Sequence, residues 1–240
     1  MLPWLIRAIE SPREPSRPVV EFGCGKGYLS FFLAGALGAV RPAPVRIVGV
    51  DRDHALVECC QRARDALGWD EPELVAGTCE AFVIDPAPLL VTSLHACDVV
   101  TDHVLAAGIA LGAEHIVVAP CCQFTIQRRL RQGGHRHEWG YIARSFPLLG
   151  SRFSEFVTEA IRCLCLRAHG YDVAVREFVS GVATPKNVLI IARQTGVRNE
   201  RAAIELRRLE EALHLTCEVK ASLARRLAVM TAAETHTEKG

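Results

Sequence analysis

Short runs of apolar residues recur along this chain, and longer stretches with a helical spacing of apolar residues separate them. Several runs lack the alternation of polar and apolar residues that a half-exposed strand shows, which is typical of strands buried on both faces. Strands that alternate with helices predict an α/β fold with helices on both faces of a sheet. We expect strands at residues 19–22, 46–51, 73–78, 89–95, 114–121, 172–179 and 187–193.

The last two strands depart from this alternation. We expect helices at residues 28–40, 54–68, 101–112 and 154–169, but only residues 180–186 separate the last two strands. A connection this short joins antiparallel strands, so the sequence predicts a mostly parallel, seven-stranded sheet with a C-terminal antiparallel hairpin. Residues 198–228 again have helical spacing. We therefore expect an α/β domain over residues 1–197 and a helical C-terminal extension over 198–240.

Composition excludes several classes of protein. Half of the residues are hydrophobic and the net charge is +1, which excludes wholesale disorder and a globally basic surface for nucleic acid. The most apolar run is too short to span a bilayer, and the N-terminus lacks the pattern of a signal peptide. Ten cysteines in 240 residues do not fit the short, loop-rich scaffolds that disulfides hold together. We expect a cytoplasmic protein with reduced thiols and no membrane partner.

A cluster of glycines marks the junction between the first expected strand and the first expected helix. Gly23, Gly25 and Gly27 lie there, in the segment EFGCGKGY at residues 21–28. Glycines at such a turn let the backbone approach a ligand closely. The fingerprint of a dinucleotide site needs its third glycine one residue later, where this chain has Tyr28. The cluster therefore predicts a ligand site but disfavours a pyrophosphate cradle.

Two acidic residues accompany this turn. Glu21 lies in the first strand, two residues before the glycines, where it would repel a phosphate but suit a cationic or amino-bearing ligand. Asp51 closes the second strand, where an acid can accept hydrogen bonds from ribose hydroxyls. A nucleoside that carries positive charge fits both acids, and S-adenosylmethionine is such a ligand. The alternative is a glycine-rich loop of an ordinary α/β fold.

Four further clusters lie at the ends of expected strands. They read TCEA at 78–81, SLHACD at 93–98, APCCQ at 119–123 and TPKN at 184–187. With the glycine turn, they resemble class I S-adenosylmethionine-dependent methyltransferases. The combination of LHAC, PCC and TPKN resembles the family that includes the eukaryotic tRNA 2'-O-methyltransferase of the acceptor stem and its bacterial relatives. This resemblance runs from about residue 19 to residue 193.

The chain departs from that family at points that concern the substrate. Asp98 follows Cys97 directly, where many members have a glycine between them, and Gln123 stands where members have histidine. The zinc modules of the eukaryotic enzyme are also missing from the sequence. The resemblance still implies a Rossmann-like fold and S-adenosylmethionine as the cofactor. The cofactor-binding residues that we expect are Glu21, Gly23, Gly25, Gly27, Asp51, Glu80 and Ala81.

Four residues at the later strand ends are candidates for catalysis. His95 or Asp98 could accept a proton, and Lys186 could act electrostatically on a hydroxyl. Cys121 could attack a pyrimidine base as a nucleophile, although no base that would activate it is identifiable. The alternatives are a buried core histidine at position 95 and packing roles for the cysteines. The spacing of these histidine and cysteine residues does not match a structural zinc site, so we expect no metal.

A basic segment precedes the fourth expected helix. Residues 123–152 contain one acid and the arginines Arg128, Arg129, Arg131, Arg136, Arg144 and Arg152. Arginine binds phosphates bidentately, and the nearby rings of Trp139 and Tyr141 could stack on a base. The segment between Arg128 and Arg152 therefore indicates an RNA partner. The alternative is a solvated, charged surface without a partner.

The leading hypothesis is a S-adenosylmethionine-dependent methyltransferase that modifies RNA, either tRNA or rRNA. In-line alignment of the nucleophile, the methyl carbon and the sulfur would supply most of the catalysis. A second hypothesis keeps this chemistry but has a protein or a small molecule as the acceptor. A third is a cofactor-binding module without catalysis. An NAD-dependent oxidoreductase is disfavoured by Tyr28. The sequence makes no prediction of the oligomeric state.

Overall fold

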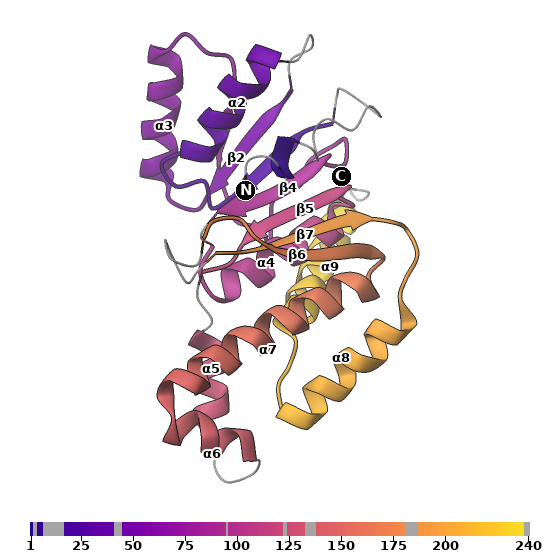
Figure 1. Cartoon of the computed structure of the whole chain (residues 1–240). Coiled ribbons are helices and arrows are strands. Elements are labelled where there is room, and N and C mark those ends of the chain that lie inside the picture. Colours follow the sequence, from indigo (N-terminus) through magenta and orange to yellow (C-terminus); the bar gives the residue numbers. More distant parts are fainter. Residues whose placement is uncertain are drawn as a thin grey trace.

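The computed structural model describes residues 1, 4–6, 17–40, 45–94, 96–121, 124–132, 138–180 and 187–237. Its centre is a seven-stranded sheet with the order β3-β2-β1-β4-β5-β7-β6 (Figure 1). The predicted α/β fold is therefore confirmed. The strands are β1 (Val19–Phe22), β2 (Ile47–Asp51), β3 (Glu73–Ala76), β4 (Leu90–Leu94), β5 (His115–Ala119), β6 (Tyr171–Glu177) and β7 (Val188–Gln194).

The strand directions confirm the predicted C-terminal hairpin. β1 pairs in parallel with β2 and β4, and β2–β3 and β4–β5 are also parallel pairs. β7 runs antiparallel to both of its neighbours, β5 and β6. The chain order reverses between β1 and β4, which is the point where open α/β sheets bind ligands, outside the carboxyl ends of the strands.

Helices cover both faces of the sheet, as expected for parallel strands buried on both sides. α2 and α3 lie on one face, whereas α4, α7 and α9 lie on the other (Figure 1). The described helices are α2 (Tyr28–Val40), α3 (His54–Ala66), α4 (Val99–Ala110), α5 (Phe124–Gln132), α6 (Glu138–Ser145), α7 (Pro147–Ala168), α8 (Glu200–Leu213) and α9 (Glu218–Thr237). No helix in the described part of the chain is long and apolar enough to cross a bilayer.

Successive residues of each strand point to opposite faces and so contribute to two separate cores. In β1, Val19 belongs to the same buried cluster as Leu33 of α2, whereas Val20 belongs to the cluster that contains Leu105 of α4. The core on the α4 face is the larger of the two. It also takes in buried residues of the C-terminal helices, among them Leu206 and Leu223.

The basic segment is helical rather than a simple loop. Its described parts form α5, α6 and the first turns of α7, which begins at Pro147 and not near residue 154 as the sequence predicts. Proline favours the first helical turn because its missing N–H would have no partner there. In Figure 1, α5 and α6 lie beside the N-terminal half of α7, at the edge of the molecule.

Candidate functional site

The glycine turn after β1 has a backbone that only glycine adopts without strain. Gly23, Gly25 and Gly27 have φ values of +69°, +53° and +71°. A Cβ at Gly27 would lie 3.0 Å from the ring of Phe31, so this end of the turn is closed by α2. A Cβ at Gly25 would meet no atom within 4 Å. The turn is therefore open at Gly25, where a ligand can approach the backbone.

Asp51, at the end of β2, holds this turn in place. Its Oδ2 accepts a hydrogen bond of 2.8 Å from the Gly25 N–H, and its Oδ1 accepts one of 3.0 Å from the Asp53 N–H. A carboxylate oxygen has two lone pairs, so both oxygens can still accept a bond from a hydroxyl group. Because the Gly25 N–H already donates to Asp51, the turn has one backbone donor fewer for a phosphate.

Glu21 lies beneath the turn, not on an open surface. Its side chain is buried, and its carboxyl accepts a 2.5 Å hydrogen bond from the Ser30 Oγ of α2. Burial raises the pKa of Glu21 to about 7, and nearby Asp51 adds to the rise, whereas the bond from Ser30 opposes it. When ionised, Glu21 therefore gives the turn a negative electrostatic field. Its carboxyl is hydrogen-bonded to Ser30.

The loop after β3 contains the other two expected cofactor residues. Residues 78–82 form a tight turn in which the Ala81 and Phe82 N–H groups donate to the Thr78 carbonyl. Phe82 packs edge-on against Phe22, the residue before Gly23, with ring centroids 5.6 Å apart. Glu80 Oε1 lies 2.6 Å from Nδ1 of His103 on α4. The structure therefore places this loop beside the glycine turn.

Asp98 directly precedes α4, but its side chain binds the first turn of α5, a role that the sequence does not reveal. Its carboxylate accepts hydrogen bonds from the Thr125 N–H at 3.1 Å and from the Thr125 Oγ1 at 2.7 Å. Its backbone has a φ of +55°, which is uncommon for a residue other than glycine. The Asp98 carboxylate therefore fixes α5 to the carboxyl edge of the sheet. Thr125 is 27 positions further along, so no local pattern indicates this contact.

Two cysteines meet at the same edge. Cys97 follows β4 and Cys121 follows the neighbouring strand β5, and their Sγ atoms lie 3.0 Å apart. The sequence predicts a role for Cys121 but not this pairing. The parallel register of the two strands brings the thiols together, since each lies two or three residues beyond a paired strand end. The strand that leads to Cys97 is joined to the residue before the glycine turn, since Ser93 of β4 donates a 2.7 Å hydrogen bond to the Phe22 carbonyl.

Two expected catalytic residues, His95 and Lys186, lie outside the described residues. Within the described ranges, no group of three histidine, cysteine or acidic side chains is arranged to hold a metal ion. The site as described therefore consists of the glycine turn, Asp51, the 78–82 loop, Asp98 and the cysteine pair.

A buried arginine links two of the helices that lie behind this edge of the sheet. Arg162 of α7 donates to Asp102 of α4 through Nε at 2.9 Å and Nη2 at 3.0 Å, and also to Glu159 and the Asp98 carbonyl. Burial alone would lower the pKa of Arg162, but the carboxylates of Asp102 and Glu159 raise it above its ordinary value. The guanidinium therefore stays charged and ties α7 to α4. Sequence reasoning missed this link between the two helices because Asp102 lies 60 positions from Arg162.

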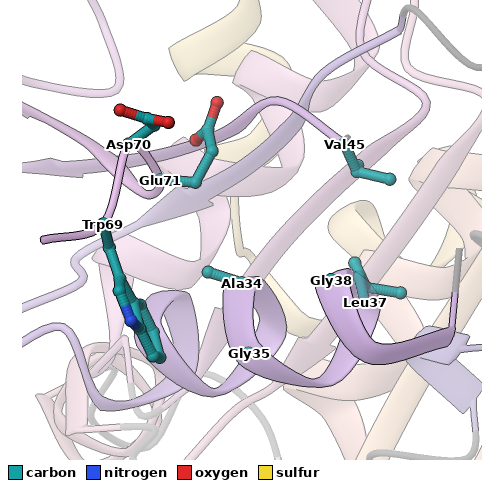
Figure 2. Close-up of a pocket in the computed structure, with 8 residues that line it drawn as sticks. All are labelled: Ala34, Gly35, Leu37, Gly38, Val45, Trp69, Asp70 and Glu71. Atoms are coloured by element: carbon teal, nitrogen blue, oxygen red, sulfur yellow. The ribbon is translucent and has the colours of Figure 1, made fainter. Parts of the chain in front are cut away.

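A cavity of about 330 Å³ lies at the opposite edge of the sheet (Figure 2). It is bounded by α2 and by the segment before β3, with Trp69 on one side and the carboxylates of Asp70 and Glu71 above the helix. Its other lining residues are small or apolar. It lies at the amino ends of β2 and β3, and the described residues that line it include no cysteine, histidine, serine or lysine. The glycine turn at the carboxyl edge is therefore the better candidate for the reaction site.

The residues at the carboxyl edge fit a cationic nucleoside. The open backbone at Gly25 admits a close ligand, Asp51 retains acceptor capacity for ribose hydroxyls, and both acids favour a positive charge. S-adenosylmethionine has these features: an adenine, a ribose, an amino group and a sulfonium.

The comparison with protein families identifies a methyltransferase domain. A family described as a methyltransferase domain matches residues 4–129, more than half of the chain. No curated protein matches the sequence. Similar solved structures include the magnesium protoporphyrin IX methyltransferase of Synechocystis with bound SAH, at 15% identity and a TM-score of 0.47, covering 81% of this chain and 80% of that one.

Two rRNA enzymes are also among the similar structures. An rRNA methylase of Streptococcus thermophilus is 12% identical with a TM-score of 0.49, and the match covers 78% of this chain and 92% of that one. The 23S rRNA methyltransferase ErmE is 14% identical with a TM-score of 0.47, and the match covers 91% of this chain and 80% of that one.

Proposed function

The chain belongs to the methyltransferase domain family, and on that premise we propose that it transfers a methyl group from S-adenosylmethionine to RNA. When bound, S-adenosylmethionine supplies a methyl group on a positively charged sulfur. The carboxyl edge of β1, β2 and β4 is the part of the chain that would bind it. The acceptor would enter beside the cysteine pair, where β4 and β5 end.

The residues of the turn would each hold a different part of the cofactor. Asp51 would accept hydrogen bonds from the ribose hydroxyls, and the 78–82 loop with Glu80 and Ala81 would border the adenine. Gly23, Gly25 and Gly27 would let the amino acid end lie against the backbone. Glu21, buried beneath them, would favour the positive charge without a direct contact.

Alignment of the acceptor would provide most of the rate enhancement, since a well-oriented nucleophile gains about 7–11 kcal/mol over free reactants at best. Among the expected catalytic residues, His95 and Lys186 remain candidates for handling the proton of a hydroxyl acceptor. Cys121 remains a candidate nucleophile for a base acceptor, with Cys97 as its neighbour at 3.0 Å. Asp98 is better placed to hold α5 than to accept a proton, because Thr125 already uses its carboxylate.

The observation that carries the RNA proposal is that α5 begins beside the candidate site and exposes arginine residues. This helix starts at the reaction edge through the Asp98–Thr125 contact and then presents Arg128 and Arg129 to solvent. The rings of Phe124 and Tyr141, on α5 and α6, are more than half exposed. Exposed arginines beside exposed rings are what single-stranded RNA needs, since the guanidinium groups bind phosphates and the rings stack on bases.

The test is transfer of radiolabelled methyl groups from S-adenosylmethionine into extracts of cells that lack the gene, with and without ribonuclease. We expect the label in a ribonuclease-sensitive fraction. The double variant Arg128→Glu, Arg129→Glu should lose most of this label, whereas Arg207→Glu, at an exposed position of α8, should keep it. Label that appears only in protein or small molecules would contradict RNA as the acceptor. Absence of transfer with every acceptor would contradict catalysis itself.

A further inference from the structure

The C-terminal helix α9 lies where a crossover helix would stand in a regular α/β alternation. The connection from β3 to β4, residues 77–89, is described throughout and contains no helix. α9 packs along α4, which follows β4, and joins the same core as Phe22 and Val50 (Figure 1). A segment that is remote in sequence therefore covers this part of the sheet.

Arg226 of α9 reaches from there into the loop after β3. Its Nη1 donates to the Cys79 carbonyl and its Nη2 donates to the Phe82 carbonyl. The residue is only 1% exposed. Because one rigid guanidinium spans both carbonyls, it fixes the two ends of the tight turn at 79–82 relative to each other.

The surroundings of Arg226 are unusual for a buried cation. The partners of both Nη atoms are main-chain carbonyls and not carboxylates, and Nε has no hydrogen-bond partner among the described residues. Burial of a charge is costly when it is only partly compensated. A neutral, apolar side chain of similar length could fill the same space but would remove the donor from both carbonyls, so packing alone does not explain an arginine here.

The loop that Arg226 holds is the one that borders the cofactor site. Phe82 packs on Phe22, directly before the glycine turn, and Glu80 contacts His103. We propose that Arg226 is a positioning residue for S-adenosylmethionine: it fixes the 78–82 loop from behind and so preorganises the adenine side of the site. This inference rests on the cofactor site of the proposed function, but not on RNA as the acceptor.

Preorganisation of this kind affects binding more than the chemical step. In Arg226→Met, we expect the Kd for S-adenosylmethionine to rise at least about tenfold, the effect of losing hydrogen bonds to a charged group. The KM for S-adenosylmethionine should rise in parallel, while kcat at saturating cofactor stays within about twofold of wild type. Arg226→Lys keeps the charge but cannot span both carbonyls, so its Kd for S-adenosylmethionine should lie between those of the wild type and of Arg226→Met.

The experiment is calorimetric titration of the full chain with S-adenosylmethionine and with 5′-methylthioadenosine, which keeps the adenine and ribose but lacks the amino acid end. The loss of affinity should be equal for both ligands. Arg225→Met is the matched control, since Arg225 is the exposed neighbour and pairs with Glu218 on its own helix. If Arg226→Met does not fold, the same titrations are made with Arg226→Lys. Hydrogen exchange at residues 78–82 should then be faster in Arg226→Lys than in the wild type, because the loop is held less firmly.

The outcomes are distinct. Folded Arg226 variants that bind both ligands as wild type does, even with a lower Tm, would overturn the inference and leave Arg226 a purely structural residue. A loss for S-adenosylmethionine but not for methylthioadenosine would also overturn it. If the wild-type chain bound neither ligand, the cofactor site of the proposed function would fail together with this inference.

Discussion

At the scale of single residues, Glu21 makes the stability of the protein depend on pH. Burial raises its pKa from 4.5 to about 7. The folded state therefore holds this proton more tightly than the unfolded state does, and Glu21 stabilises the fold least when it is ionised. The contribution of this group to the free energy of unfolding falls as pH rises from about 4.5 to about 7.

We expect Glu21→Gln to remove this part of the pH dependence, because glutamine does not titrate in that range. Denaturant unfolding at about pH 5 and about pH 8 measures it, as the change in the free energy of unfolding between the two. Glu58→Gln, at an exposed position of α3, is the control and should keep the wild-type slope. An unchanged slope in Glu21→Gln would show that its carboxyl is already ionised well below pH 7 in the folded state.

The residue scale also shows which site residues the sequence could and could not identify. Gly23, Gly25 and Gly27 were identifiable, because a strand-to-helix turn with positive φ values requires glycine. Asp51 was identifiable from its position at the end of β2. The roles of Asp98 and Arg226 were not, because their partners are distant in sequence. The Cys97–Cys121 contact depends on strand register, which two separate apolar runs do not specify.

At the scale of secondary-structure elements, Arg162 joins α7 to α4 beneath the reaction edge. Removal of its side chain would leave Asp102 and Glu159 as uncompensated buried acids. We expect Arg162→Met to lower the free energy of unfolding by about 3–5 kcal/mol, the range for a broken buried ion pair. Denaturant unfolding measures this.

Arg152→Met on the same helix is the control for Arg162. The Arg152 side chain is 60% exposed, and its ion pair with Glu155 is 3.8 Å long. Exposed pairs contribute about 0–1 kcal/mol, so this variant should stay close to wild type. Equal effects of the two substitutions would show that the Arg162 network does not tie the two helices together.

Elements with a buried face were predictable, whereas those without one were not. α2 has the predicted bounds, since its apolar face packs into the core through Leu29, Leu33 and Leu37. The first turns of α7 were missed because Leu148 and Leu149 there are exposed, so their apolar character does not mark a core face. α5 was part of a segment interpreted only by its charge, and its first turn is held by Asp98, which lies 27 positions earlier, directly before α4.

At the scale of the whole molecule, the C-terminal helices belong to the main core. Leu206, Leu213, Cys217, Val219 and Leu223 are buried in the same cluster as the strands. We expect a chain of residues 1–197 to lack cooperative unfolding, because loss of these residues exposes the α4 face of the sheet. Thermal unfolding followed by near-ultraviolet circular dichroism measures this.

A chain that ends at residue 228 is the control for this truncation. It keeps Leu223 and Arg226 and should unfold cooperatively. Cooperative unfolding of residues 1–197 would instead support the boundary near residue 197 that the sequence predicts, with an independent domain before it.

The sequence alone determined the order and type of the central elements, the antiparallel hairpin, the glycine turn and its two acids. These follow from local rules: the spacing of apolar residues, the length of a connection and the conformations open to glycine. Only the tertiary structure decided that Asp98 holds α5, that two thiols meet at neighbouring strand ends, and that α9 reaches the loop beside the site. Each of these contacts joins residues at least 24 positions apart, and such contacts arise only when the whole chain packs.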